Sequence, residues 1–302
     1  MNKNRLGSSD LWISEVGLGC MSLGTDMEFG TKLIHQAMDL GVNFLDTADL
    51  YDSGRNEEVV GEAIRGRRQD VVIATKVGNR RIPGREGWVW DPSKDYILNA
   101  VKESLRRLGT DYIDLYQLHG GTLDDPIDET IEAFEQLQKE GLIRYYGISS
   151  IRPNVIREYV SRSRIVSVMN QYSLLDRRAE EEVLPLLEKN GIGLIARGPL
   201  AGGRLAGTGE TKVQDGYLDY SSEELKQVRL QLRELAGSPE DMGTIAIRYS
   251  LQHPAVAAAI PGASSVNQLL DNIRAAKRGT LTETEYSKLQ SISKPNQYEN
   301  HR

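Results

Sequence analysis

Four side chains that could act together on a carbonyl group occur in order along the chain: Asp46, Tyr51, Lys76 and His119. Each lies at or just beyond the end of a short apolar run typical of a buried β-strand. A lysine ammonium beside a tyrosine hydroxyl would lower the pKa of that hydroxyl towards the range useful for proton transfer. The aspartate would supply the countercharge of the lysine, and the histidine would orient the carbonyl oxygen. The set indicates proton delivery to a C=O group, with the hydride coming from a bound cofactor.

Each of these residues also has an ordinary structural interpretation. A lysine at a strand end is commonly solvated, and a histidine after an apolar strand is commonly structural. Asp49 and Asp52 flank Tyr51 and are alternatives to Asp46, but as loop residues we expect them to be solvated or to cap the next helix. The joint placement favours chemistry, because the carboxyl ends of parallel strands in one barrel meet at the same mouth, where catalytic groups lie.

Strand-like and helix-like segments alternate eight times. Such alternation predicts a mostly parallel sheet, and eight strands is the number that closes a barrel. The strand candidates are residues 16–19, 43–46, 71–76, 112–118, 143–149, 166–171, 193–196 and 258–261. Amphipathic stretches at 97–108, 131–140, 180–190 and 242–251 predict helices. Residues 4–7 and 11–14 predict a preceding β-hairpin. The expected fold is therefore an α/β protein, a (β/α)₈ TIM barrel with an N-terminal β-hairpin, as a single domain over residues 1–302.

An open, doubly wound sheet is the alternative architecture. If it bound a dinucleotide, it would need a glycine fingerprint after its first strand. Gly17 and Gly19 are present, but Cys20 and Met21 follow and no third glycine opens a helix there. The absence of this signal favours the barrel.

Composition limits the classes of partner. The net charge of −6 argues against general nucleic-acid binding. Cys20 is the only cysteine, which excludes an intramolecular disulfide and a thiolate metal cluster. The chain has no signal-peptide pattern and no apolar run of 18 residues, so we expect a cytoplasmic protein without a membrane partner. A monomer is the simplest expectation.

Three segments carry a resemblance to a known family. They are residues 43–51 followed by Gly61-Glu62-Ala63-Ile64, residues 73–76, and residues 105–119. Together they place Asp46, Tyr51, Lys76 and His119, and the chain resembles the aldo-keto reductase superfamily over essentially its whole length. The resemblance implies a bacterial NADP-dependent oxidoreductase that reduces aldehydes and ketones. It further implies that tyrosine is the general acid, that lysine and aspartate tune it, and that histidine orients the substrate carbonyl.

The same resemblance implies the cofactor-binding residues. The nicotinamide carboxamide is expected to contact Ser149, Ser150 and Gln171. The pyrophosphate is expected to contact Arg197, Gly198, Leu200, Gly202 and Arg204. The adenosine phosphate and adenine are expected to contact Gly262, Ser264, Gln268, Asp271 and Asn272. Hydroxyls and N–H groups at the start of the last of these segments are expected to converge on one anion site. Two departures stand out: Ser150 replaces the usual asparagine, and no lysine or arginine lies near 262–264. NADPH is the expected cofactor, with NADH possible.

Other interpretations remain open at this point. The family also includes non-catalytic nucleotide-binding regulatory subunits on the same fold. A metal-dependent hydrolase is less favoured, because His35, His253 and His301 lie in helical or terminal contexts, and no metal is expected. Trp88 and Trp90 either line a substrate pocket or pin their loop to the barrel. Arg204 is either a surface residue or a phosphate clamp.

Overall fold

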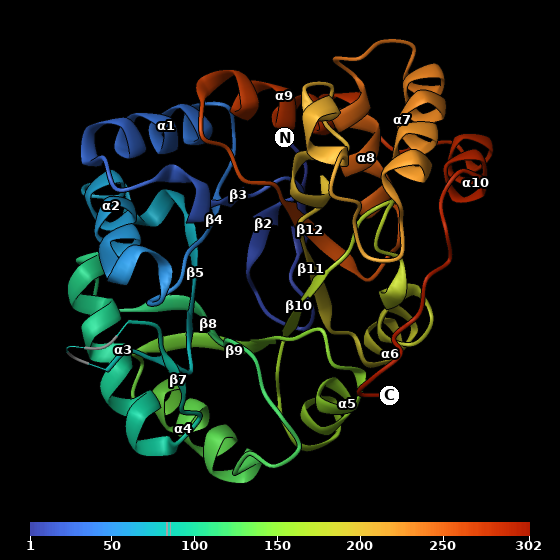
Figure 1. Ribbon diagram of the computed structural model, residues 1–302. Helices are drawn as coiled ribbons and strands as arrows, with labels where there is room; N and C mark the ends of the chain where they lie inside the picture. The colour runs from blue at the N-terminus through green and yellow to red at the C-terminus, as the bar shows by residue number, and fades with distance from the viewer. Residues whose placement is uncertain (83, 85) are drawn as a thin grey trace.

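A parallel barrel forms the centre of the molecule. The computed structural model describes residues 1–82, 84 and 86–302. Parallel neighbours follow one another around the sheet, and the isolated bridges Val16–Ala259 and Gly19–Gly262 join its first and last strands. Figure 1 views this barrel along its axis, with helices forming an outer ring. Its strands are β3 (Leu18–Gly19), β4 (Phe44–Asp46), β5 (Val72–Val77), β8 (Ile113–Leu118), β9 (Ile143–Ser149), β10 (Ser167–Gln171), β11 (Gly193–Arg197) and β12 (Val256–Ile260).

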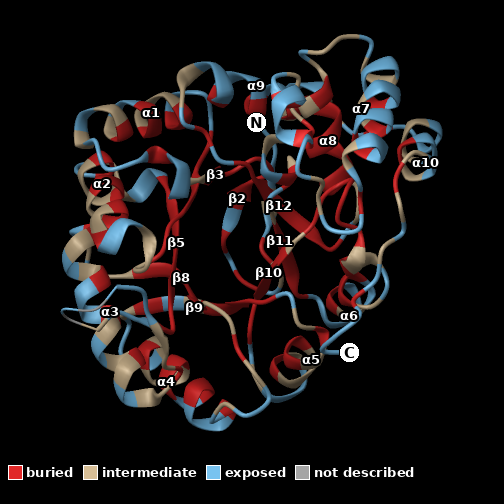
Figure 2. Ribbon diagram, in the orientation of Figure 1, coloured by how far each residue is buried: buried red, intermediate tan, exposed pale blue. Residues whose placement is uncertain are grey.

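The helices bury one side against this barrel. In Figure 2 the strands and the inner sides of the helices are buried, whereas the outer sides are exposed. The ring comprises α1 (Met27–Asp39), α2 (Arg55–Ala63), α3 (Lys94–Leu108), α4 (Ile127–Lys139), α5 (Pro153–Arg162), α6 (Val183–Asn190), α7 (Ser222–Ala236), α8 (Met242–Ser250) and α9 (Val266–Arg278), and α10 (Glu283–Ser291) follows near the C-terminus.

The third helix illustrates how the sequence dictates these elements. The Ser93 hydroxyl accepts the Tyr96 N–H at the start of α3, and Gly109 ends the helix in a left-handed conformation. Ile97 and Val101 lie one turn apart and are both fully buried. The helix therefore has its predicted apolar stripe, although it begins three residues earlier than the predicted start at residue 97.

The predicted (β/α)₈ barrel and N-terminal hairpin are confirmed. The hairpin consists of β1 (Lys3–Arg5) and β2 (Trp12–Ser14), paired antiparallel. Leu6, Leu11 and Ile13 of this segment are buried in one cluster with the barrel-interior residues Phe44 and Leu115. The hairpin therefore fills the N-terminal end of the barrel with apolar side chains.

Some boundaries differ from the predicted ones for clear physical reasons. The last strand ends at Ile260 rather than at residue 261, because Pro261 has no N–H to continue the ladder. Helix α6 begins at Val183 rather than at residue 180, because Glu180 belongs to a preceding 3₁₀ turn over Arg178–Glu180.

No described helix is both long and apolar enough to span a membrane.

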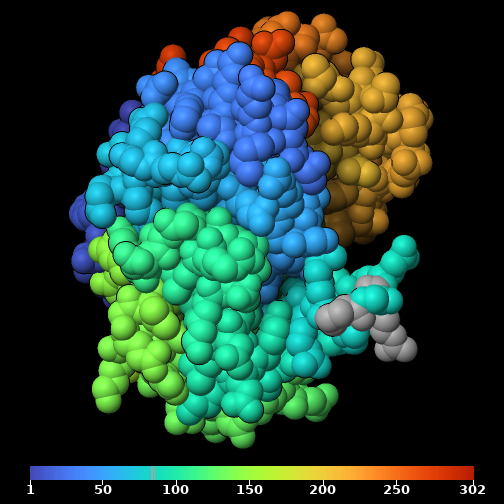
Figure 3. Space-filling view, turned by 90° about the vertical axis from the view of Figure 1, so that its left-hand side faces the viewer, coloured from blue at the N-terminus to red at the C-terminus, as the bar shows by residue number. Residues whose placement is uncertain are grey.

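Two long segments stand at the C-terminal mouth of the barrel. The first contains the antiparallel pair β6 (Asn79–Arg80) and β7 (Val89–Trp90). The second follows β11 and contains two 3₁₀ turns, Ala201–Gly203 and Gly209–Val213. In Figure 3 both segments project on one side of the molecule, and the N-terminal residues lie on the other side. These segments therefore shape the mouth.

Candidate active site

The four predicted catalytic residues meet at this mouth. The Lys76 Nζ donates hydrogen bonds to Asp46 Oδ2 at 2.7 Å, to the Thr47 carbonyl at 2.7 Å and to the Tyr51 hydroxyl at 3.2 Å. The His119 ring meets the Tyr51 ring edge-on, with centroids 5.9 Å apart. Asp46 ends β4, Lys76 lies in β5, and His119 follows β8, so adjacent parallel strands bring three of the four together.

Tyr51 reaches this group through a strained turn. Immediately after it, Asp52 and Ser53 adopt positive φ angles of 47° and 60°, which non-glycine residues rarely do. Gly54 follows at φ 87°, and a Cβ there would lie 2.8 Å from the Arg107 Cδ. Backbone strain of this kind persists where the surrounding structure holds a residue in place, and here it lies directly beside Tyr51.

Burial and charge set the protonation states of the group. Burial alone would lower the pKa of Lys76, but Asp46 and Tyr51 together outweigh it and raise that pKa, so the ammonium persists. Burial raises the pKa of Tyr51, and the opposing effect of Lys76 is smaller. The predicted lowering of the tyrosine pKa is therefore wrong for this structure, because desolvation outweighs the ammonium. Burial, followed by the charges of Lys76 and Arg197, lowers the pKa of His119 to about 3, so its imidazole is neutral.

Asp49 is not the solvated or capping residue that the sequence suggested. Its Oδ1 is buried without a hydrogen-bond partner among the described residues, and the N-cap of α2 is Gly54, without a side-chain cap. Burial, followed by the charge of Glu57, raises the pKa of Asp49 to about 7. With a pKa near neutrality, the Asp49 carboxyl group lies within electrostatic reach of Lys76.

A cavity of about 830 Å³ opens beside Asp46 and Tyr51. This volume lies within the range of small-molecule and cofactor pockets. Ten of the predicted cofactor residues line it: Gln171, Arg197, Gly198, Leu200, Gly202, Gly262, Ser264, Gln268, Asp271 and Asn272. The structure therefore gathers residues from β10, β11, β12 and α9 around one space.

Three predicted cofactor residues do not line this cavity. Ser149 and Ser150 lie at and after the end of β9, and the Ser150 hydroxyl accepts the Arg152 N–H at 3.2 Å. The Arg204 Nε donates to the Gly216 carbonyl at 3.1 Å, and its guanidinium lies 5.0 Å from the Tyr217 ring centroid. Arg204 thus supports its own loop, and a direct cofactor contact for these three residues remains a prediction.

The donors at the start of α9 are partly occupied. The Gln268 Oε1 accepts both the Ser264 N–H at 2.8 Å and the Ser264 hydroxyl at 3.0 Å, and the Ser265 hydroxyl accepts the Gln268 N–H at 3.3 Å. Asn272 donates to the Gly262 carbonyl at 3.0 Å. An anion approaching Ser264 would therefore have to displace the Gln268 side chain.

Sequence reasoning missed several residues of the cavity wall. Thr208, Lys212, Tyr217 and Glu240 line it from the segment between β11 and α8. The Lys212 Nζ donates to the Gly202 carbonyl at 3.2 Å, a contact made by the return of the chain through the second 3₁₀ turn. No motif marks these residues, because irregular backbone brings them to the cavity.

The two tryptophans of the first long segment differ in role. The Trp90 Nε1 donates to Asp125 Oδ1 at 2.9 Å, and its ring packs over the backbone of Gly78 and Gly120. Trp90 therefore pins its loop to the barrel. Trp88 is 53% exposed and does not line the cavity.

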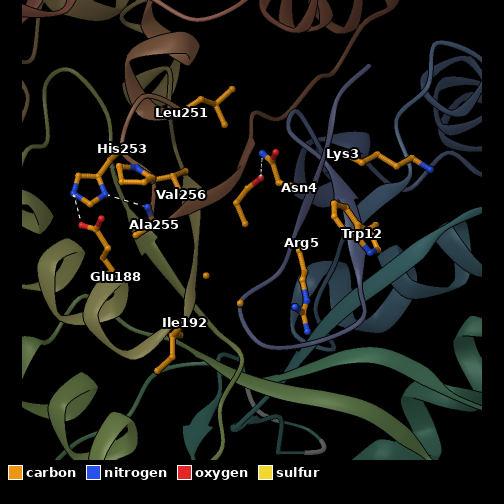
Figure 4. A pocket seen from close by; sticks show the side chains of 15 residues that line it. Lys3, Asn4, Arg5, Trp12, Glu188, Ile192, Leu251, His253, Ala255 and Val256 are labelled. Carbon is orange, nitrogen blue, oxygen red and sulfur yellow. Dashed lines mark hydrogen bonds and ion pairs between the residues drawn. The ribbon is translucent and has the colours of Figure 1, made fainter.

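A second crevice, of about 500 Å³, lies beside the hairpin at the other end of the barrel (Figure 4). His253 is 3.9 Å from Glu188 there, and Asn4 donates to the Ala257 carbonyl. Within the described part of the chain, no three His, Cys, Asp or Glu side chains converge so as to hold a metal ion.

Fold and site together define a (β/α)₈-barrel protein with a buried Asp–Lys–Tyr group beside a large cavity. The sequence model of the aldo/keto reductase family matches residues 15–294, and the chain therefore belongs to that family of oxidoreductases.

Individual relatives agree with this assignment. The chain is 58% identical to the oxidoreductase YqkF of Bacillus subtilis, with both chains fully covered. It is 54% identical to the aldo-keto reductase AKR11C1 from Bacillus halodurans in its holo form, with a TM-score of 0.93 and coverage of 100% and 99%. The glycerol dehydrogenase AKR11B4 from Gluconobacter oxydans is 26% identical, with a TM-score of 0.87 and coverage of 99% and 98%.

Proposed function

We propose that this protein reduces aldehydes and ketones to alcohols with a nicotinamide cofactor, and that Tyr51 is the general acid. One observation carries the proposal: the buried Lys76 ammonium bridges Asp46 and the Tyr51 hydroxyl at the wall of the large cavity. Such a group is suited to proton transfer in a water-poor environment.

The cavity fits the expected cofactor in size and chemistry. Gln171 offers polar contacts, and Arg197 and Lys212 bring positive charge to the cavity wall. Gly198 and Gly202 have positive φ angles and leave the backbone of this loop accessible to phosphate oxygens. The bound nicotinamide would supply the hydride. NADPH is the proposed cofactor, with NADH as a weaker one.

The residues of the chain then perform the remaining steps. The neutral His119 donates a hydrogen bond to the substrate carbonyl oxygen and orients it towards Tyr51. The Tyr51 hydroxyl would give its proton to that oxygen. The adjacent Lys76 ammonium stabilises the phenolate that remains, and Asp46 keeps the ammonium in place. The raised pKa of Tyr51 keeps the proton on the hydroxyl until it is needed.

Turnover of an aldehyde and ketone panel with NADPH and with NADH tests the proposal. Tyr51→Phe should reduce kcat by a factor of about 10²–10⁴ or more and leave the dissociation constant of the cofactor nearly unchanged. Near-wild-type turnover by this variant, with chemistry limiting, would remove Tyr51 from the proposed role. Cofactor binding by the wild type without turnover of any carbonyl would instead favour a regulatory nucleotide-binding protein.

A further inference from the structure

The orientation of the Gln171 side-chain amide is fixed by its neighbours. Its Nε2 lies 2.8 Å from Asp176 Oδ2. Asp176 is fully buried and receives two parallel hydrogen bonds from the Arg178 guanidinium, each of 2.8 Å, so its carboxylate is ionised. Since an ionised carboxylate only accepts hydrogen bonds, the NH₂ group of Gln171 must face Asp176.

Tyr217 occupies the remaining hydrogen of that amide. The Gln171 Nε2 donates to the Tyr217 hydroxyl at 2.9 Å, and both side chains line the cavity. An NH₂ group carries two hydrogens, and Asp176 and Tyr217 use both. Only the carbonyl oxygen of Gln171 is left to meet a ligand, and it can only accept a hydrogen bond.

The protein holds Tyr217 in place before any ligand binds. Tyr217 and Tyr220 exchange backbone hydrogen bonds of 3.0 and 2.9 Å, which close a tight turn. Arg204 covers the Tyr217 ring from one side. From the C-terminal segment, Lys294 and Asn296 donate to Asp219 at 2.6 and 3.1 Å. The turn therefore has anchors in its own loop and near the end of the chain.

We propose that Tyr217 is a positioning residue which, with Asp176, locks Gln171 as a pure hydrogen-bond acceptor. The site then binds the primary carboxamide of nicotinamide, which carries N–H groups, more tightly than a ketone of the same shape. This inference rests on the proposed function. Tyr217 acts through Gln171, so its hydroxyl matters for cofactor recognition and not for the proton transfer at Tyr51.

The test compares the dissociation constants of NADP⁺ and of its 3-acetylpyridine analogue, in which a methyl ketone replaces the carboxamide, by titration calorimetry. Because one neutral hydrogen bond is at stake, the wild type should favour NADP⁺ by roughly two- to tenfold. Gln171→Leu should bring this ratio close to one, and Tyr217→Phe should lower it at least about twofold. Tyr217→Phe added to Gln171→Leu should change it no further.

Tyr220→Phe is the matched control, because it removes a hydroxyl from the same turn that bonds to the Lys294 N–H and does not line the cavity. For Tyr220→Phe, the ratio of the dissociation constants of the two compounds should equal that of the wild type. Should Tyr217→Phe not fold, Tyr217→Leu gives the same comparison. An unchanged ratio in the Tyr217 variant, or an equal fall in the Tyr220 variant, would overturn the inference. Equal wild-type affinity for both compounds would overturn the inference but not the proposed function, whereas binding of neither would overturn the proposed function.

Discussion

Lys76 is the residue on which the candidate site depends most. It is fully buried, and its ammonium contacts three oxygens, those of Asp46, Thr47 and Tyr51. A buried ion pair adds little stability by itself, since desolvation offsets the attraction, but an unpaired buried charge is strongly destabilising. Stability alone therefore does not account for the pair, which supports the proposed role of Lys76 beside Tyr51.

Lys76→Met should cost both activity and stability. Turnover should fall by at least about 10²-fold, and the unpaired Asp46 carboxylate should reduce the free energy of unfolding by roughly 3–5 kcal/mol. The double variant Asp46→Asn/Lys76→Met carries no unpaired charge, so it should recover most of the stability and none of the turnover. Urea denaturation with single-turnover kinetics measures both. Equal stability of single and double variants would contradict this account of the pair.

Asp49 makes stability depend on pH. Its folded-state pKa of about 7 lies above the ordinary value of 3.8, so the folded state binds more protons between these values. The stability from this group is present below about pH 4 and is lost as pH rises towards 7. Asp49→Asn should therefore gain stability relative to wild type across this window, by at most about 4 kcal/mol.

Urea denaturation at pH 5 and at pH 8 measures this gain. Asp124→Asn, at an exposed position in another loop of the mouth, is the control and should show the same difference from wild type at both pH values. A stability difference for Asp49→Asn that does not increase with pH would show that the carboxyl group is hydrated in solution.

At the scale of elements, two helical glycines illustrate how closely the outer ring is packed. A Cβ on Gly61 in α2 would lie 2.5 Å from the Arg107 carbonyl oxygen at the end of α3. A Cβ on Gly243 in α8 would have the Leu200 Cδ2 as its nearest atom, at 3.6 Å, which is an ordinary van der Waals contact. Only the first glycine is required by a close approach of backbones.

Replacement of glycine by alanine should therefore change stability in opposite directions at these two positions. Gly243→Ala should stabilise the ligand-free protein by roughly 0.5–1 kcal/mol, because alanine loses less backbone entropy in a helix. Gly61→Ala should destabilise it by roughly 1–3 kcal/mol, because α2 must move away from α3. Thermal unfolding compares the two variants, and a stabilising Gly61→Ala would show that the helices can separate without cost.

The elements that sequence predicted best are those governed by local pattern. Residues 143–149 match β9 over their whole length, because a short apolar run between turn signals suffices to define a buried strand. Three of the four predicted catalytic residues, Asp46, Lys76 and His119, follow the same logic, because they lie at or near strand ends, whereas the turn after β4 places Tyr51. Lys212 and Tyr217 could not be predicted, because their positions depend on contacts with Gly202 and Gln171 across an irregular segment. The pKa direction of Tyr51 failed because burial cannot be read from residue types.

At the scale of the whole molecule, the cavity brings together two parts of the chain that are far apart in sequence, residues 19–51 and residues 169–272. Its wall includes Gly19 from the first barrel strand, Gln171 and Arg197 from the middle, and Ser264 and Asn272 from the last unit. A ligand that fills it binds the folded barrel and not the unfolded chain. At a hundredfold excess over its dissociation constant, such a ligand adds about 2.7 kcal/mol to the free energy of unfolding.

Cofactor preference should therefore be visible as a difference in thermal stabilisation. We expect NADPH to raise Tm more than NADH, but modestly, because no lysine or arginine occupies positions 262–264. Ser264→Arg should increase the preference for NADPH roughly tenfold, since a charge-assisted contact contributes about 1.5–3 kcal/mol against about 0.5–1.5 for a neutral one. Gln268→Glu keeps an acceptor for the Ser264 N–H but adds negative charge, so it should favour NADH.

Dissociation constants for both cofactors in the wild type and the two variants provide the decisive ratio. Asn267→Glu places the same charge on an exposed neighbour in α9 that does not line the cavity, so it controls for the general field at this helix. If neither Ser264→Arg nor Gln268→Glu moves the ratio beyond that control, the 2′-phosphate binds elsewhere. Arg197 and Lys212 then become the next residues to replace, because both are cationic and line the same cavity, whereas Arg204 is turned towards the Gly216 carbonyl.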